Sequence, residues 1–269
     1  MEAADRESGR LSTDARIRSH AWLAWILSAL GAFAEGQRHG EEALRLAALE
    51  GRGATPIVVH AFLSYLYLTQ GDLEHAILVC DQGLALSCAS GNRNMLSTIV
   101  AGLGYAYALQ GRLAEGRALL EEAISAGIRT GGLIAQANRL ARLSEICRLA
   151  GRGEEAWQHA RQALDLARYQ KARGEEARAL HQLGVVYAHA DPPDVTQAEA
   201  HYQQALALAE ELGMRPLQAH CHRGLGTLYA QTGRWAQARA ALSTAIALYR
   251  AMDMTFWLPQ AEAMLAHIV

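Results

Sequence analysis

LGYAYALQGRLAEG, residues 103–116, shows the plan on which the chain is built. Leu103 and Tyr107 are four residues apart, so they lie on one face of a helix and form part of a core stripe. Gly111 ends this helix, because glycine adopts the left-handed conformation of a helix C-terminus at little cost. A second helix starts directly after the turn. The stretch LGTLYAQTGRWAQA, residues 225–238, has the same layout, so the unit of the fold is a pair of helices joined by a short turn.

This unit recurs every 40 residues along the chain. Each copy has a small residue, a glycine or turn residue seven positions later, and a second small residue five positions after that. The six copies are Ala24, Gly31 and Gly36; Ser64, Gly71 and Ala76; Gly104, Gly111 and Gly116; Ser144, Gly151 and Ala156; Gly184, Asp191 and Ala198; and Gly226, Gly233 and Ala238. The step departs from 40 only by two extra residues in the fifth copy. A fixed period of this length indicates a solenoid, in which each unit contacts only its neighbours.

Leucine occupies one fixed place in the first helix of each unit. These expected core residues are Leu23, Leu63, Leu103, Leu143, Leu183 and Leu225. Glycine inside a helix costs about 0.5–1 kcal/mol relative to alanine, so Gly104 and Gly116 need a packing reason. Close contact between the two antiparallel helices of a unit supplies that reason. We therefore expect an all-α fold, a solenoid of antiparallel helix pairs with about 40 residues per repeat.

The pattern resembles the tetratricopeptide repeat, in which leucine, a small residue, an aromatic residue, a turn glycine and further small residues follow one another. The resemblance covers residues 13–252 as six repeats, at about 13–52, 53–92, 93–132, 133–173, 174–214 and 215–252. It implies a right-handed superhelix with a concave groove that binds a protein or peptide. The units are six residues longer than the usual 34 and lack the closing proline of that family, so we expect longer second helices.

The two ends of the chain lie outside the repeats. Residues 1–12 form a polar leader that we expect to be flexible, and residues 253–269 are expected to form a C-terminal capping helix. The terminal repeats are apolar around residues 22–33 and 256–269, which leaves open the formation of a homo-oligomer through these ends.

A longer resemblance lies near the C-terminus. Residues 211–265 are similar to the helical tail of bacterial multidomain regulators, in which a class III adenylate/guanylate cyclase domain precedes an AAA-type ATPase and tetratricopeptide repeats. The chain contains no GxxxxGK[ST] phosphate loop. The resemblance therefore implies the context of a larger signalling protein, without nucleotide chemistry in this chain.

Composition and charge argue against several classes of partner. The net charge is −2 and the isoelectric point is about 6.6, whereas a nucleic-acid-binding repeat carries a basic excess, so we predict no nucleic-acid partner. The first strongly apolar stretch, residues 21–34, is too short for a membrane span, and we predict no membrane association. Cys80, Cys88, Cys147 and Cys221 have no disulfide or zinc spacing. Free thiols fit a reducing compartment, so we expect a cytoplasmic protein.

The repeat accounts for nearly every cluster that resembles a catalytic or metal site. His220, Cys221 and His222 are adjacent on a helix and point about 100° apart, so they cannot hold one metal ion together. Acidic pairs such as Glu121–Glu122 are adjacent and are expected on solvated helix faces. We therefore predict no metal, no cofactor and no enzymatic activity.

The concave groove is the better candidate for a binding site. Places that line the groove in the repeat family give Arg18, Trp25, Tyr65, Tyr105, Asn138, Glu145, Arg148, Arg178, His181, His220 and Arg223 as a peptide-binding set. The N-terminal half of this set is an aromatic ladder and the C-terminal half is polar and basic. Rigid aromatic side chains bury a large area at a low entropy cost, which suits an extended peptide or an apolar helix. The alternative, that these aromatic residues pack only between units, stays open.

These features lead to two main hypotheses for function. The first is a non-catalytic scaffold or regulatory module that binds a protein segment in the groove. The second is an effector-sensing helical domain of a bacterial transcription regulator, or a module for self-assembly. A stand-alone enzyme or RNA-binding repeat is disfavoured by the near-neutral charge and by the lack of a phosphate or metal motif.

Overall fold

The computed structural model describes residues 2–50, 55–93, 95–129 and 135–268, with side chains described from residue 13 onward except for Glu50. Within these ranges the chain forms thirteen α-helices and no strand. They are α1 (Glu2–Leu30), α2 (Phe33–Glu50), α3 (Thr55–Gln70), α4 (Leu73–Ser90), α5 (Leu96–Leu109), α6 (Leu113–Arg129), α7 (Gln136–Leu149), α8 (Gly153–Tyr169), α9 (Arg173–Ala188), α10 (Val195–Glu211), α11 (Arg215–Gln231), α12 (Trp235–Ala251) and α13 (Leu258–His267). None of these helices combines the length and the apolar character needed to cross a bilayer.

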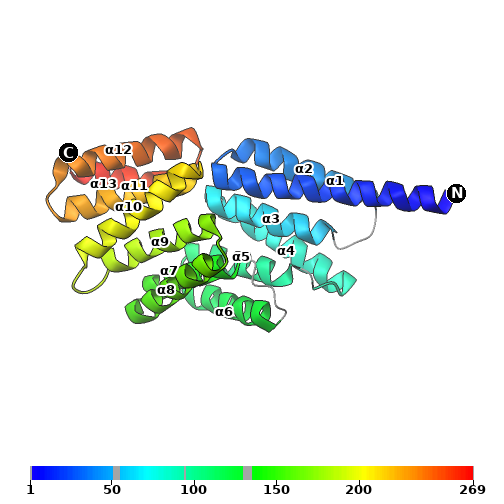
Figure 1. Cartoon of the computed structure of the whole chain (residues 1–269), viewed down its shortest axis with the longest axis horizontal. Coiled ribbons are helices and arrows are strands. Elements are labelled where there is room, and N and C mark those ends of the chain that lie inside the picture. Colours follow the sequence, from blue (N-terminus) through cyan, green and yellow to red (C-terminus); the bar gives the residue numbers. More distant parts are fainter. Residues whose placement is uncertain (1, 51–54, 94, 130–134, 269) are drawn as a thin grey trace.

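The helices pair as the period of the sequence predicts. α1 packs on α2, α3 on α4, and so on to α11 and α12, and each pair also contacts the next pair along the chain (Figure 1). The predicted all-α, right-handed superhelical solenoid is confirmed. α1 begins at Glu2, so residues 2–12, which we expected to form a flexible leader, continue this helix.

Two glycine positions show why the unit needs small residues. Gly111 has φ 88°, the left-handed conformation expected at the turn between the helices. Gly104 lies where α5 crosses α6, and a Cβ atom there would lie 2.8 Å from the carbonyl oxygen of Gly116. The two backbones therefore approach so closely that no side chain fits between them.

The leucine stripe holds in five of the six units. Leu63, Leu103, Leu143, Leu183 and Leu225 are buried. Leu23 is 40% exposed, so the expectation that it is a core residue is wrong. α1 packs against α2, α3 and α11, and the face of α1 that carries Leu23 remains open to solvent.

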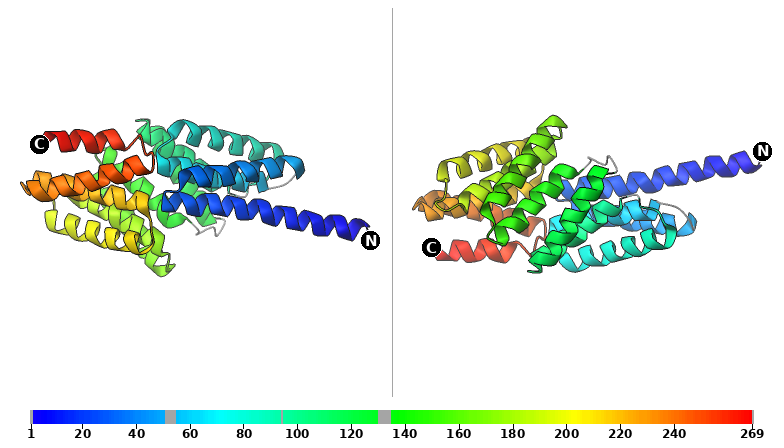
Figure 2. Two further views of the ribbon diagram at one scale, coloured as in Figure 1. Left: turned by 90° about the horizontal axis from the view of Figure 1, so that it is seen from above. Right: turned by 90° about the horizontal axis from the view of Figure 1, so that it is seen from below.

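The last unit folds back against the first two. A single hydrophobic cluster joins Ala24, Phe33 and Leu66 of the first units to Tyr249 and Trp257 near the C-terminus. A Cβ atom at Gly71, in the turn between α3 and α4, would lie 2.7 Å from Cβ of Phe256. In Figures 1 and 2 the C-terminal helices meet the ends of the first helices near the middle of the molecule. The expectation that each unit contacts only its neighbours is therefore wrong for the last unit, and the superhelix closes into a ring.

Candidate functional site

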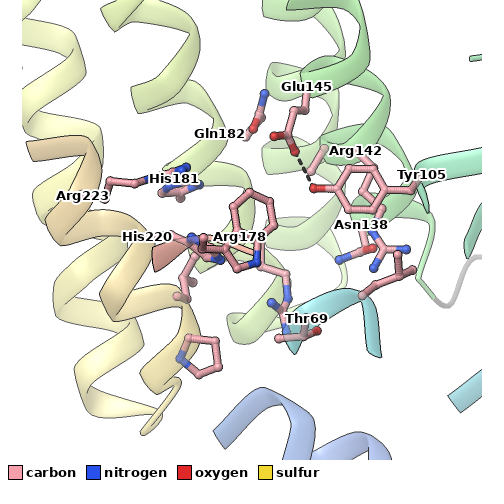
Figure 3. Close-up of a pocket in the computed structure, with 15 residues that line it drawn as sticks. Thr69, Tyr105, Asn138, Arg142, Glu145, Arg178, His181, Gln182, His220 and Arg223 are labelled. Carbon is pink, nitrogen blue, oxygen red and sulfur yellow. Dashed lines mark hydrogen bonds between the residues drawn. The ribbon is translucent and has the colours of Figure 1, made fainter. Parts of the chain in front are cut away.

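A cavity of about 120 Å³ lies at the centre of this ring and is called the central cavity below. Its walls come from α3, α5, α7, α9 and α11, and Trp257 just before α13 completes them. The predicted groove residues that line it are Tyr105, Asn138, Glu145, Arg178, His181, His220 and Arg223. Figure 3 shows these side chains converging from several helices on one space. The repeat register thus places residues that are up to 155 positions apart in the sequence around one cavity, since Leu68 and Arg223 both line it.

Tyr105, Arg142 and Glu145 form a linked group at one side of the central cavity. The Tyr105 hydroxyl donates a hydrogen bond to Glu145 Oε2 at 2.6 Å (Figure 3). The Arg142 guanidinium lies 4.7 Å from the centre of the Tyr105 ring and 4.8 Å from that of Tyr65, distances at which a cation attracts an aromatic face. Burial raises the pKa of Tyr105, so its hydroxyl stays protonated and remains a donor.

Two histidines face the opposite side of the cavity. Burial, with the nearby charge of Arg223, lowers the pKa of His181 to about 3 and holds that of His220 well below 6.5. The Nδ1 atom of His220 lies 2.7 Å from the hydroxyl oxygen of Tyr249. Both imidazoles are therefore neutral at pH 7, and the arginines supply the positive charge of the cavity.

A second cavity, of about 800 Å³, lies in the N-terminal half and is called the N-terminal cavity below. It is walled by Trp22 and Trp25 of α1, Phe62 and Tyr65 of α3, and residues of α5, α6 and α7. The four rings contact one another in a chain: Trp22 to Phe62 at 4.8 Å between ring centres, Trp25 to Phe62 at 6.0 Å, and Trp25 to Tyr65 at 6.4 Å. Trp22 keeps 44% of its surface exposed, whereas Phe62 and Tyr65 are buried.

The charged lining of the N-terminal cavity is basic. Two exposed arginines, Arg93 and Arg129, and the buried Arg139 line it, with a single carboxylate, that of Glu122, among the described lining residues. None of these arginines forms an ion pair with a carboxylate in the described part of the chain. Arg139 is held by the Ser97 and Thr98 hydroxyl oxygens, each 3.1 Å from its Nη2. The cavity thus combines an apolar wall with positively charged lining residues.

Two residues of the predicted peptide-binding set lie outside both cavities. Arg18 is exposed on α1 and forms an ion pair with Asp14 at 2.8 Å. Arg148, near the end of α7, lines neither cavity, and its buried Nε has no hydrogen-bond partner among the described residues. The predicted aromatic ladder is divided, since Trp25 and Tyr65 line the N-terminal cavity and Tyr105 the central one.

The prediction missed one place of the unit, two residues before the first small residue. That place supplies Trp22 and Phe62 to the N-terminal cavity, and Arg142 and Gln182 to the central cavity. Large aromatic and charged residues at one repeat position were the signal that could have found it. No such signal existed for Trp257, because this residue lies outside the repeat register.

One group of described side chains has the composition of a metal site. Ligand atoms of Cys147, Glu155 and His159 lie within 4.8 Å of one another. Glu155 already pairs with Arg117 at 3.1 Å and with Arg152. These two guanidinium groups neutralise the carboxylate and repel a cation, so the group is better explained as part of an ion-pair network that joins α6, the turn before α8 and α8 itself.

Comparison with known sequences identifies repeats of the expected kind. Residues 175–251, which span most of the fifth and sixth units, match the tetratricopeptide repeat family. A stretch of 133 residues is 31% identical to the regulatory protein AfsR of Streptomyces griseus. This similarity covers 49% of the chain but only 13% of that much longer protein.

Three solved structures share the fold. A Rap protein complexed with Competence and Sporulation Factor is 12% identical, with a TM-score of 0.66 over 95% of this chain and 85% of that one. A signal-transduction ATPase of the STAND class with a tetratricopeptide repeat sensor, from Pyrococcus horikoshii, is 17% identical, with a TM-score of 0.61 over 86% and 34%. BtubC from P. vanneervenii is 21% identical, with a TM-score of 0.55 over 85% and 92%. At these identities the similarity shows the fold alone.

Proposed function

We propose that this chain is a non-catalytic interaction module that binds an apolar peptide or helix segment in the N-terminal cavity. The observation that carries the proposal is the exposed indole of Trp22 on the wall of a cavity of about 800 Å³. Binding pockets of this size are mainly apolar with a few placed polar groups, and partially exposed tryptophan is a frequent anchor of interfaces.

The charge of the cavity lining narrows the class of peptide. Arg93, Arg129 and Arg139 outnumber Glu122 among the described residues that line the cavity. A peptide with an apolar residue flanked by acidic residues would match both features. Its apolar side chain would enter the cavity, and the arginines would pair with the flanking carboxylates. Such a segment follows the helix-in-groove mode of recognition, in which an apolar face docks and charged residues set the orientation.

The test uses two exposed tryptophans as a matched pair. A phage-displayed peptide library is selected on the chain, and the affinity of the selected peptides is measured by fluorescence polarisation. Trp22→Ala should weaken binding by at least about tenfold, whereas Trp235→Ala should leave it unchanged, because Trp235 is 54% exposed on α12 and lines neither cavity. Equal losses in the two variants, or none in Trp22→Ala, would contradict the proposal.

A second copy of the chain is another possible occupant of this surface, and light scattering distinguishes it. Of the two apolar ends considered for self-association, Trp257 and Ala261 are buried within the chain. Trp22, Leu23 and Ile26 of α1 remain exposed, at 44%, 40% and 45%. A stable dimer that Trp22→Ala converts to a monomer would assign α1 to self-assembly and overturn the peptide proposal.

The second candidate function is effector sensing within a larger regulator. The specific observation in its favour is the central cavity, whose walls include Thr69 of the second unit and Trp257 of the last segment. A ligand in this cavity would contact both ends of the ring and stabilise its closure, by binding the closed form more tightly than an open one. The similarity to a bacterial regulatory protein and to a signalling ATPase with a repeat sensor supports this context. Limited proteolysis of the chain, with and without a saturating ligand of the central cavity, tests this candidate. A bound ligand should protect the contact between the last segment and the first two units from cleavage.

A further inference from the structure

Three arginines reach the central cavity from three different helices. Arg142 comes from α7, Arg178 from α9 and Arg223 from α11. Like charges gathered in a partly buried space repel one another, and this repulsion costs stability unless opposite charge balances it.

The described carboxylates do not balance this charge. Arg142 and Arg223 form no ion pair with any carboxylate in the described ranges. Arg178 has a loose contact with one carboxylate, since its Nε lies 3.9 Å from Oε1 of Glu175. The carboxylate that lines the cavity, Glu145, accepts the hydrogen bond from Tyr105. Arg223 donates from Nη1 to the neutral amide oxygen of Gln260 at 2.6 Å. Three positive charges thus face one lining carboxylate.

Two buried polar atoms at the cavity lack partners. Neither Nε of Arg178 nor Oδ1 of Asn138 has a hydrogen-bond partner among the described residues. The side chain of Arg178 retains 23% exposure, so this wall of the cavity is reached by solvent. Buried polar atoms are normally hydrogen-bonded, so the unpaired Nε–H of Arg178, a donor, indicates a missing acceptor, whereas Oδ1 of Asn138 is itself an acceptor and needs a donor.

We propose that the central cavity binds a small oxyanion, a phosphate or a carboxylate group, held by Arg142, Arg178 and Arg223. The volume of about 120 Å³ admits an anion of this size and excludes a helix or a folded peptide. Guanidinium groups bind such oxyanions through paired, charge-assisted hydrogen bonds. The neutral imidazoles of His181 and His220 line the same space and add ring nitrogens for further hydrogen bonds.

This inference deepens the effector-sensing candidate and is independent of peptide binding in the N-terminal cavity. The anion would replace the missing countercharge between helices of the fourth, fifth and sixth units. Its binding would therefore favour the arrangement in which α7, α9 and α11 are close together.

Isothermal titration calorimetry of the full chain tests the proposal with inorganic phosphate and with succinate, at constant ionic strength, and with neutral succinamide as the control. Saturable binding of phosphate or succinate, but not of succinamide, is expected. The two anions distinguish a phosphate from a carboxylate as the group recognised. If neither anion binds saturably, the anion proposal fails while the peptide proposal stands. Binding of succinamide as tight as that of succinate would overturn the anion class and leave the effector-sensing candidate in place.

Matched arginine variants test the assignment of residues. R178Q and R223Q should each weaken anion binding by at least about tenfold, since each removes a charge-assisted contact. R239Q, which removes an exposed arginine of α12, should leave the affinity unchanged. R178K, which keeps the charge but loses the planar fork, should recover part of the affinity. Equal weakening by R239Q would overturn the assignment.

The unliganded stability of R178Q separates a ligand site from a structural role. Removing one of three like charges relieves repulsion, so R178Q should melt at the same temperature as the wild type or higher when no anion is present. R223Q is not used for this comparison because it also loses the hydrogen bond to Gln260. A lower melting temperature of R178Q would show that Arg178 serves the fold, and it would overturn the proposal.

Discussion

The two cavities use equivalent places of one repeat but differ in chemistry. The N-terminal cavity is wide, about 800 Å³, and has an aromatic wall, whereas the central cavity is about 120 Å³ and is lined by arginine and histidine. The place two residues before the first small residue is Trp22 and Phe62 in the first two units and Arg142 in the fourth. The repeat position therefore sets the direction of a side chain, and the residue type at that position decides which class of ligand the cavity can bind.

Ring closure accounts for the difference in size. The central cavity is bounded by Trp257, which packs in a cluster with Ala24 and Leu66 of the first two units. The N-terminal cavity has no such wall from the C-terminal segment and lies among α1, α3, α5, α6 and α7. A contact between the ends of the chain thus narrows one region of the concave face and leaves the other wide.

Trp257→Ala should have the largest effect and should separate the two cavities. Truncating a buried tryptophan costs about 3–5 kcal/mol of stability, and Trp257 is 7% exposed. Urea denaturation measures this loss. Anion binding in the central cavity should weaken, while peptide binding in the N-terminal cavity should persist. Loss of anion binding and peptide binding together would show that the two cavities depend on one another.

Leu143→Ala and Leu23→Ala compare one place of the unit in the two halves of the molecule. Leu143 is 3% exposed, so its truncation should cost about 2–5 kcal/mol. Leu23 is 40% exposed, so Leu23→Ala should lower the free energy of unfolding by less than about 1 kcal/mol. Chemical denaturation of both variants gives the two values. Similar losses would mean that Leu23 is covered in solution, as in a dimer through α1.

Acid should destabilise the central cavity through its histidines. The pKa of His181 is about 3 in the fold against 6.5 for the free side chain, so the unfolded chain binds the extra proton first. Its contribution to stability is complete above pH 6.5 and is lost as the pH falls toward 3, with a slope of at most about 1.4 kcal/mol per pH unit for one proton. His181→Gln should flatten this slope in urea denaturation measured across that range, and an unchanged slope would contradict the assignment.

The comparison of Tyr105→Phe with Tyr65→Phe should give the smallest difference in the free energy of unfolding. Tyr105 loses its hydrogen bond to Glu145, worth about 1–3 kcal/mol because the acceptor is charged. The hydroxyl of Tyr65 makes no hydrogen bond with a described side chain, so Tyr65→Phe should be within about 0.5 kcal/mol of the wild type. Thermal unfolding of the two variants tests the difference. A larger loss for Tyr65→Phe would contradict the placement of the two rings.

Much of the candidate site follows from the repeat register. Tyr105, Asn138, Glu145, Arg178 and Arg223 occupy places that the register assigns to the inner face, and the fold brings them to one cavity. Arg18 follows the same rule but lies exposed, in an ion pair with Asp14 of its own helix, and lines neither cavity. Residues at equivalent places of the repeat therefore line one cavity only where the helices that carry them converge.

The local pattern of residues was sufficient to predict the helix pairs, their turns and the contact between Gly104 and Gly116. Each of these depends on neighbours within one unit, where helical periodicity and the size of a side chain decide the geometry. Closure of the ring and the division of the groove into two cavities depend instead on small rotations between units, which add up along the chain. Contacts such as Phe256 against Gly71 join residues from opposite ends of the chain, and only the assembled superhelix brings them together.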